Sequence, residues 1–186
     1  MTEKKKDRVG VFIDGSNLFW AMNYRDPRTG GLRHYHIDFR KLRTLLKKRY
    51  GDIDLFYYGC EDEQPRSDHY KKKAHKQKAF HAALERKGYI LRKKALKHIG
   101  AITKCDMDVE IVMDVTQSIE GYDIVVLFSG DSDFLALLEW CYEYNKKVHV
   151  YAFKRFLSWE LWQFAQKQKQ CAYWLLDSLQ SELERL

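Results

Sequence analysis

One stretch constrains the fold more than any other: residues 125–134, Val-Val-Leu-Phe-Ser-Gly-Asp-Ser-Asp-Phe. Its first four residues are apolar, as in a strand that is buried on both faces of a parallel sheet. The apolar residues from Phe134 to Trp140 then predict a helix. Asp131 and Asp133 are therefore expected in a strand-to-helix loop at the carboxyl end of a strand, where open α/β sheets bind their ligands.

Segments that suit strands alternate with segments that suit helices along the whole chain. Strands are predicted at residues 8–14, 53–58, 89–91, 125–128, 147–153 and 173–176, the last at an edge. Helices are predicted at residues 18–22, 38–50, 67–87, 108–118, 134–144 and 159–168, with a loop over 98–107. This alternation predicts an α/β, three-layer, Rossmann-like domain. Its mainly parallel sheet has about five strands in the order 3-2-1-4-5, with helices on both faces.

The chain is expected to comprise a basic tail (1–8), the α/β domain (9–176) and a C-terminal helix (177–186). Its four cysteines are scattered and form no C-x-x-C pair, which suits reduced thiols better than a disulfide framework or a zinc site. The sequence contains neither a secretory signal nor an apolar run of about 18 residues. We therefore expect a soluble, cytoplasmic protein that does not associate with membranes.

Three separate segments bring acids to one edge of the predicted sheet. Asp14 ends the first strand, Asp131 and Asp133 follow the fourth, and Asp108 begins a helix. With a rotation of about 100° per residue, Val115 lies on the same side of that helix as Asp108, so this acid heads the stripe that packs on the sheet. Strands one and four are neighbours at the switch point, and the four carboxylates are therefore expected in one crevice.

Four carboxylates within a few ångströms repel one another and need a hard cation. Mg²⁺ or Mn²⁺ fits, because both ions prefer oxygen ligands and bind few protein donors. Such an ion can activate water and stabilise the leaving oxygen in phosphodiester hydrolysis. Each acid also has a structural alternative: Asp14 could cap the turn after it, Asp131 or Asp133 could cap the next helix, and Asp108 could interact with the helix dipole.

Three motifs together resemble the NYN domain of the PIN-like nucleases, most closely its LabA-like bacterial branch. They are residues 11–18 (Val-Phe-Ile-Asp-Gly-Ser-Asn-Leu), Asp108 with Asp114 six residues later, and residues 128–134. The resemblance covers about residues 8–153. It implies a PIN-like sheet and metal-dependent endoribonuclease activity, that is, cleavage at internal bonds of an RNA strand.

The resemblance also implies roles for individual residues. The implied catalytic residues are Asp14, Asn17, Asp108, Asp131 and Asp133, and the four acids among them are the implied metal ligands. Asn17 would orient Asp14 or a bound water, and Ser16 and Ser129 would contact phosphate or support the metal ligands. Asp114 matches a recurrent family acid, although helical geometry turns it away from the crevice. Because the family's Lys-Gly-Val-Asp is here Lys-Cys-Asp-Met-Asp (104–108), Asp106 remains an alternative to Asp108.

Positive charge is concentrated in residues 1–100, which contain 25 Lys+Arg and 12 Asp+Glu, whereas residues 101–186 contain 8 and 14. This asymmetry indicates either a polyanion-binding surface or solvated helix faces. The candidate nucleic-acid contacts are Lys71, Lys72, Lys73, Lys76, Arg92, Lys93 and Lys94. Trp20, Tyr24 or His34 could stack on unpaired bases, although such aromatic residues more often belong to the core.

The sequence therefore predicts an Mg²⁺- or Mn²⁺-dependent endoribonuclease, a hydrolase that cuts single-stranded or structured RNA and leaves 5′-phosphate and 3′-hydroxyl ends. The alternative is a catalytically weak module on the same fold that binds RNA or a regulatory protein partner. The G-x-G-x-x-G and P-loop motifs of nucleotide-binding proteins are absent from the sequence. The sequence is compatible with a homodimer.

Overall fold

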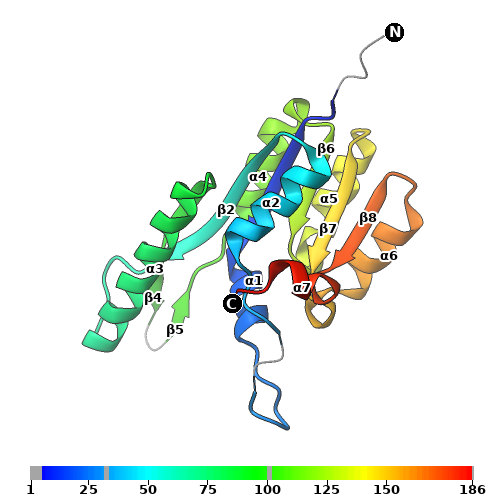
Figure 1. Cartoon of the computed structure of the whole chain (residues 1–186). Helices are drawn as coiled ribbons and strands as arrows, with labels where there is room; N and C mark the ends of the chain where they lie inside the picture. The colour runs from blue at the N-terminus through cyan, green and yellow to red at the C-terminus, as the bar shows by residue number, and fades with distance from the viewer. Residues whose placement is uncertain (1–5, 32–33, 100–101, 186) are drawn as a thin grey trace.

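The protein is built around a six-stranded sheet in which all neighbouring strands are parallel (Figure 1). The structure, a computed structural model, describes residues 6–31, 34–99 and 102–185. The strands, in sheet order, are β3 (Ile90–Ala95), β2 (Ile53–Glu61), β1 (Val9–Asp14), β6 (Ile124–Phe128), β7 (Lys147–Ala152) and β8 (Cys171–Leu175). The predicted parallel order is confirmed, and the predicted last edge strand is also confirmed as β8, which pairs with β7.

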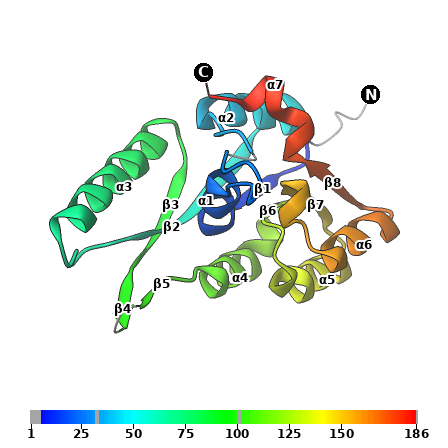
Figure 2. The same cartoon turned by 90° about the horizontal axis from the view of Figure 1, so that it is seen from below.

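Helices cover both faces of the sheet, which confirms the three-layer prediction (Figure 2). One face packs against α1 (Gly15–Asn23), α2 (Phe39–Tyr50), the end of α3 (Asp68–Arg86) and the short α7 (Gln180–Leu183). The other face packs against α4 (Asp108–Ser118), α5 (Leu135–Glu143) and α6 (Trp159–Lys167). Short 3₁₀ turns follow α4, β6, β7 and β8, at Ile119–Gly121, Ser132–Phe134, Lys154–Phe156 and Leu176–Leu179.

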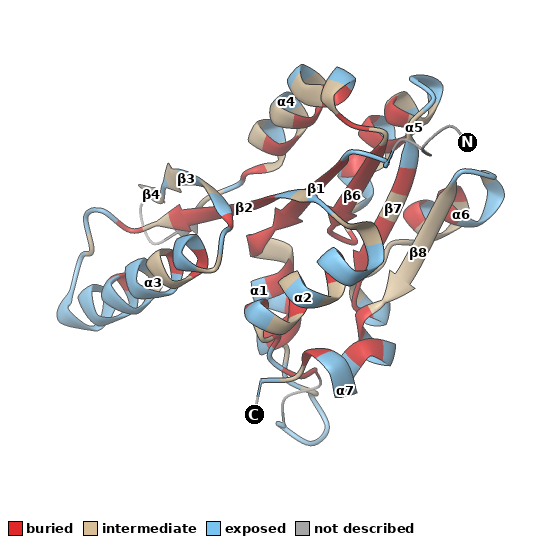
Figure 3. Cartoon of the chain, turned by 45° about the horizontal axis from the view of Figure 1, so that its top comes forward, coloured by how far each residue is buried: buried red, intermediate tan, exposed pale blue. Residues whose placement is uncertain are grey.

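The central strands are buried on both faces, as their continuous apolar sequences predict (Figure 3). Alternate residues of β1 enter different cores, because successive side chains of a strand point to opposite faces. Val11 and Ile13 lie in the core beneath α1 and α2, whereas Phe12 lies in the core beneath α4 and α5. The interior of β1 therefore carries no charged residue, and the first acid, Asp14, comes where the strand ends.

Both ends of α2 are capped, by Asp38 and by Gly51. The carboxylate of Asp38 accepts hydrogen bonds from the backbone N–H groups of Arg40 and Lys41 at 2.7 and 3.2 Å. Gly51 ends the helix with a φ of 84°, a conformation that glycine adopts without steric cost. The C-terminal segment packs against this region, since Asp38 N–H donates to the Leu183 carbonyl at 2.7 Å. Only residues 180–183 of this segment form an α-helix. The predicted basic tail falls mainly on residues 1–5, outside the described residues.

The predicted loop over residues 98–107 is in part a small hairpin. Strands β4 (Lys97–Ile99) and β5 (Ile102–Lys104) pair antiparallel and form a separate two-stranded sheet. The preceding strand β3 is also longer than predicted, because it continues through the basic run to Ala95. No helix among the described residues is both long and apolar enough to cross a membrane.

The prediction that all four cysteines are reduced is wrong for one pair. Cys60, near the end of β2, and Cys105, just before α4, form a disulfide across a sequence separation of 45 residues. Cys141 is buried and free, and Cys171 is half-buried and free. Cysteine spacing does not predict this pair, because the two residues come close only in the folded chain, where the segment before α4 returns to the end of β2.

Reduction of this disulfide is expected to lower the free energy of unfolding by about 2–4 kcal/mol, because the bond restricts a long loop in the unfolded chain. The measurement is urea unfolding with and without a phosphine reductant. The double variant Cys60→Ser, Cys105→Ser is the control and should not respond to the reductant. A wild-type protein whose unfolding is equally insensitive would contradict this prediction.

Candidate metal centre

The site begins where β1 and β6 end side by side. The register pairs Ile13 with Phe128, so the next residues, Asp14 and Ser129, are also neighbours. Both are buried, with Asp14 only 5% exposed. One Asp14 oxygen accepts a hydrogen bond from the Ser129 hydroxyl and the other from the backbone N–H of Asn17, each at 3.0 Å. Asp14 thus joins both strand ends to the first turn of α1.

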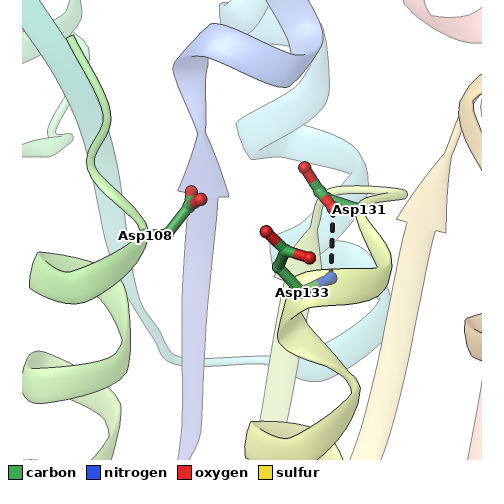
Figure 4. Close-up of side chains that lie close together, drawn as sticks. All are labelled: Asp108, Asp131 and Asp133. Atoms are coloured by element: carbon green, nitrogen blue, oxygen red, sulfur yellow. Dashed lines mark hydrogen bonds between the residues drawn. The ribbon is translucent and has the colours of Figure 1, made fainter.

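Three carboxylates meet above this pair. Asp108, Asp131 and Asp133 each offer an oxygen, and these oxygens all lie within 4.8 Å of one another. Figure 4 shows Asp108, at the start of α4, facing the other two acids across the end of β1. Asp131 also accepts a hydrogen bond from the Asp133 backbone N–H at 3.1 Å, which fixes the loop that carries both acids. We call these three residues the acid triad.

Gly130 fastens the acid-bearing loop to two helices. Its N–H donates to the Asn17 side-chain oxygen at 3.4 Å, and its carbonyl accepts from the Ser158 N–H, at the start of α6, at 2.9 Å. A Cβ atom at Gly130 would lie 1.8 Å from the carbonyl oxygen of Phe156. Only glycine allows this close approach. Ser158 carries no signal in the sequence, because its contact with Gly130 is made by backbone atoms.

The electrostatics of the site favour a cation. Burial, together with the nearby carboxylates of Asp106, Asp14 and Asp131, raises the pKa of Asp108 to about 7. Burial also raises the pKa of Asp14, in spite of its hydrogen bonds to Asn17 and Ser129. The donors of the triad are all carboxylate oxygens, which are the ligands preferred by hard divalent ions. The residues present therefore fit Mg²⁺ or Mn²⁺.

The substitution Asp108→Asn is expected to stabilise the metal-free protein, by about 0.5–2 kcal/mol at neutral pH and above. The pKa of Asp108 is raised from 3.8 to about 7 in the folded state, so the folded state binds more protons than the unfolded state between these two pH values. The free energy of unfolding therefore falls as the pH rises through this range, and the substitution removes that fall. Urea unfolding in EDTA, repeated at several pH values, measures the effect. A gain that is equal at low and high pH would contradict it.

Two further candidate acids, Asp106 before α4 and Asp114 within it, lie outside the triad. Asp106 is exposed and its carboxylate accepts the Asp108 N–H at 2.9 Å, so Asp108 and not Asp106 faces the other two acids. Asp114 accepts hydrogen bonds from the Tyr58 hydroxyl at 2.8 Å and from the Arg92 side chain at 2.6 Å. Asp114 is thus turned away from the crevice, as its position on the helix predicts.

The basic candidates fall into two groups. The run in β3 is ion-paired within the protein: Arg92 with Asp114 at 2.6 Å, Lys94 with Glu110 at 2.6 Å, and Lys93 with Glu61 at 3.4 Å. The second group lies on α3 and is exposed; it comprises Lys71, Lys72, Lys73 and Lys76 (Figure 3). RNA contact by either group stays a prediction, and the exposed lysines of α3 carry it better.

The profile of the NYN domain family matches residues 8–169. This chain belongs to the NYN domain family. This chain is 31% identical over 146 residues to the low amplitude and bright protein LabA of Synechococcus elongatus. The match covers 73% of this chain and 68% of LabA.

The fold of this NYN domain also occurs in a crystal structure of a protein of unknown function from Vibrio parahaemolyticus RIMD 2210633. The two share a TM-score of 0.69 at 23% identity, over 94% of this chain and 95% of the other. NYN domains are part of the PIN-like nuclease superfamily, which generally uses divalent metals. The chain therefore carries an RNase-like domain with a cluster of acidic residues at the carboxyl edge of its sheet.

Proposed function

We propose that this NYN domain is an endoribonuclease that depends on Mg²⁺ or Mn²⁺. The observation that carries the proposal is the acid triad, whose three carboxylates come from two separate elements and meet at the switch point of the sheet. Membership of the NYN family supports the choice of RNA as substrate. The exposed lysines of α3 are proposed to contact the phosphates of the RNA.

Asp108, Asp131 and Asp133 would hold the ion. Asp14 is proposed as a fourth carboxylate that attracts the ion, since its charge interacts with those of Asp108 and Asp131. A bound divalent ion would lower the pKa of water and stabilise the oxygen that leaves the phosphodiester. Without the ion, three carboxylates this close would repel both one another and the phosphates of the substrate.

The protein's own residues supply orientation. Ser129 donates to Asp14 and accepts the Asp131 N–H at 3.3 Å, so one hydroxyl links the buried acid to the triad. Asn17 makes two hydrogen bonds here: its backbone N–H donates to Asp14, and its side-chain oxygen accepts the Gly130 N–H. We infer that these contacts keep the carboxylates fixed while the substrate binds and the product leaves.

The test is cleavage of an end-labelled RNA by the purified full chain, with Mg²⁺, with Mn²⁺ and with EDTA. We expect internal cleavage only when the divalent ion is present, with 5′-phosphate ends that a 5′-phosphate-dependent exonuclease can degrade. Cleavage that continues undiminished in EDTA would contradict a metal-dependent mechanism. Binding of RNA without any product would instead favour the alternative function, an RNA-binding module.

A further inference from the structure

One covalent bond joins the sheet to the segment that leads into the acid triad. Cys60 is buried in β2, one residue before the strand ends, and its disulfide partner Cys105 lies shortly before Asp108 in the chain. Between the two cysteines the chain forms α3, β3 and the hairpin of β4 and β5, which lie together on one side of the molecule (Figure 2). The disulfide therefore closes this whole excursion at the point where the chain returns to begin α4.

The two ends of the bond differ in how firmly the backbone holds them. Cys60 is part of the sheet: it is paired with Lys94 of β3, and its side chain lies in the core beneath α4 and α5. Cys105 is half-buried and lies in the connection between β5 and α4, residues 105–107, which belongs to no helix or strand. The bond thus ties an irregular segment to a fixed point in the sheet.

The first turn of α4 depends on this irregular segment. Met107, the residue before the helix, makes no side-chain hydrogen bond that would cap it. The Asp108 N–H is instead bound by the Asp106 carboxylate at 2.9 Å, and the Asp106 carbonyl accepts a hydrogen bond from Lys94 Nζ at 3.0 Å. The first N–H groups of a helix need such acceptors, because they have no partner within the helix. The position of Asp108 therefore depends on Asp106, the residue next to Cys105.

Repulsion within the acid triad acts against this arrangement. Its three carboxylates offer oxygens within 4.8 Å of one another, so without an ion they push Asp108 away from the other two acids. The loop that carries Asp131 and Asp133 is held on both sides, through the contacts of Gly130 with α1 and with the start of α6. The start of α4 is the side of the triad that yields more easily, and the disulfide is next to it.

We propose that the Cys60–Cys105 disulfide is a redox-sensitive support of the metal centre. The oxidised bond holds Asp108 in the acid triad, and reduction of the bond by a dithiol lowers the affinity of the triad for the divalent ion. The inference rests on the metal centre of the proposed function and adds a regulation that this function does not contain. Both cysteines are positioning residues, since they act through Asp108 and are not members of the triad.

The reduction is an exchange with an external dithiol. A thiolate of the dithiol attacks Sγ of Cys105, the more exposed of the two residues. The electron pair of the broken S–S bond leaves on Sγ of Cys60, which takes up a proton. The second thiolate of the dithiol then attacks its own sulfur in the mixed disulfide and releases Cys105, which also becomes a thiol. The protein disulfide thus gains two electrons and two protons, and the dithiol is oxidised to a disulfide.

The test is a calorimetric titration of Mn²⁺ into the full chain, either oxidised or reduced by a phosphine in the absence of oxygen. We expect reduction to weaken Mn²⁺ binding about 10-fold or more, as loss of a group that orients a metal ligand does. The double variant Cys60→Ser, Cys105→Ser should bind like the reduced wild type and should not respond to the phosphine. Leu46→Ala, in the core on the other face of the sheet, lowers stability away from the site and should keep the wild-type affinity.

Amide hydrogen exchange gives a second readout, which needs neither metal nor RNA. Reduction should speed exchange in the first turn of α4, residues 108–111. The rest of the helix should stay protected, because the buried Val115 packs it on the sheet. An increase of equal size throughout the chain would show that the bond acts on global stability alone, and would contradict the proposal.

The outcomes separate this inference from the proposed function. Equal Mn²⁺ affinity of the oxidised and the reduced protein would overturn the inference even if RNA is cut. Redox-dependent Mn²⁺ binding in a protein that never cuts RNA would support the inference and refute the nuclease. Failure of both forms to bind Mn²⁺ would overturn the two together.

Discussion

The substitution Asp131→Asn is expected to lower kcat/KM for RNA cleavage by about 100- to 1,000-fold. Asparagine has nearly the same shape, and its side-chain oxygen can still accept the Asp133 N–H that the aspartate accepts at 3.1 Å. The loop therefore keeps its fold while the triad loses one of its three negative charges. Affinity for Mn²⁺ should fall in parallel. The measurement is cleavage kinetics at saturating Mn²⁺, with thermal unfolding of the same variant.

Asp52→Asn is the matched control for this substitution. Asp52 is exposed and lies just before the start of β2, at the edge of the sheet opposite the triad, so the same change of charge should leave cleavage at the wild-type rate. If Asp131→Asn cleaves as fast as wild type, the acid triad is not the catalytic centre. If both variants lose activity equally, the loss reflects total charge and not the site.

The substitution Gly130→Ala is expected to have the second largest effect, because the new Cβ would meet backbone. It would lie 1.8 Å from the carbonyl oxygen of Phe156 and 2.5 Å from its carbonyl carbon, so either the loop or the segment before α6 must move. We expect a loss of about 1–3 kcal/mol in the free energy of unfolding. Cleavage should also fall, since the displaced loop carries Asp131 and Asp133.

The control for this variant is Gly121→Ala, where a Cβ would meet no atom within 4 Å. Its free energy of unfolding should stay within about 0.5 kcal/mol of wild type. Urea unfolding of the two alanine variants, side by side, makes the comparison. Equal stability of the two would show that the contacts of Gly130 with α1 and the start of α6 do not hold the loop.

Much of the fold can be predicted from the sequence, since its strongest signals are local. The all-apolar runs of β1 and β6 predict buried strands, and the alternation with helices then places their acids at one edge. Helical periodicity also separates Asp108, which heads the buried stripe of α4, from Asp114, which bonds Tyr58 and Arg92. These are consequences of backbone geometry and need no knowledge of distant contacts.

The features that escaped prediction depend on contacts between distant segments. The hairpin of β4 and β5 consists of two three-residue strands, too short for a periodic pattern. Cys60 and Cys105 meet only after β2 and the entry to α4 are in place. The β3 basic run looks like a free cationic patch in the sequence. Strand alternation turns Arg92 and Lys94 toward the acids of α4 and Lys93 toward Glu61.

The central claim is that Asp108, Asp131 and Asp133 together hold a divalent ion, and a crystal grown with Mn²⁺ tests it most directly. The account predicts an anomalous difference peak between the three carboxylates, at a distance from each that is typical of oxygen ligands, and no peak there in Asp131→Asn. Mn²⁺ bound elsewhere, with the three carboxylates left without an ion at saturating concentration, would contradict it.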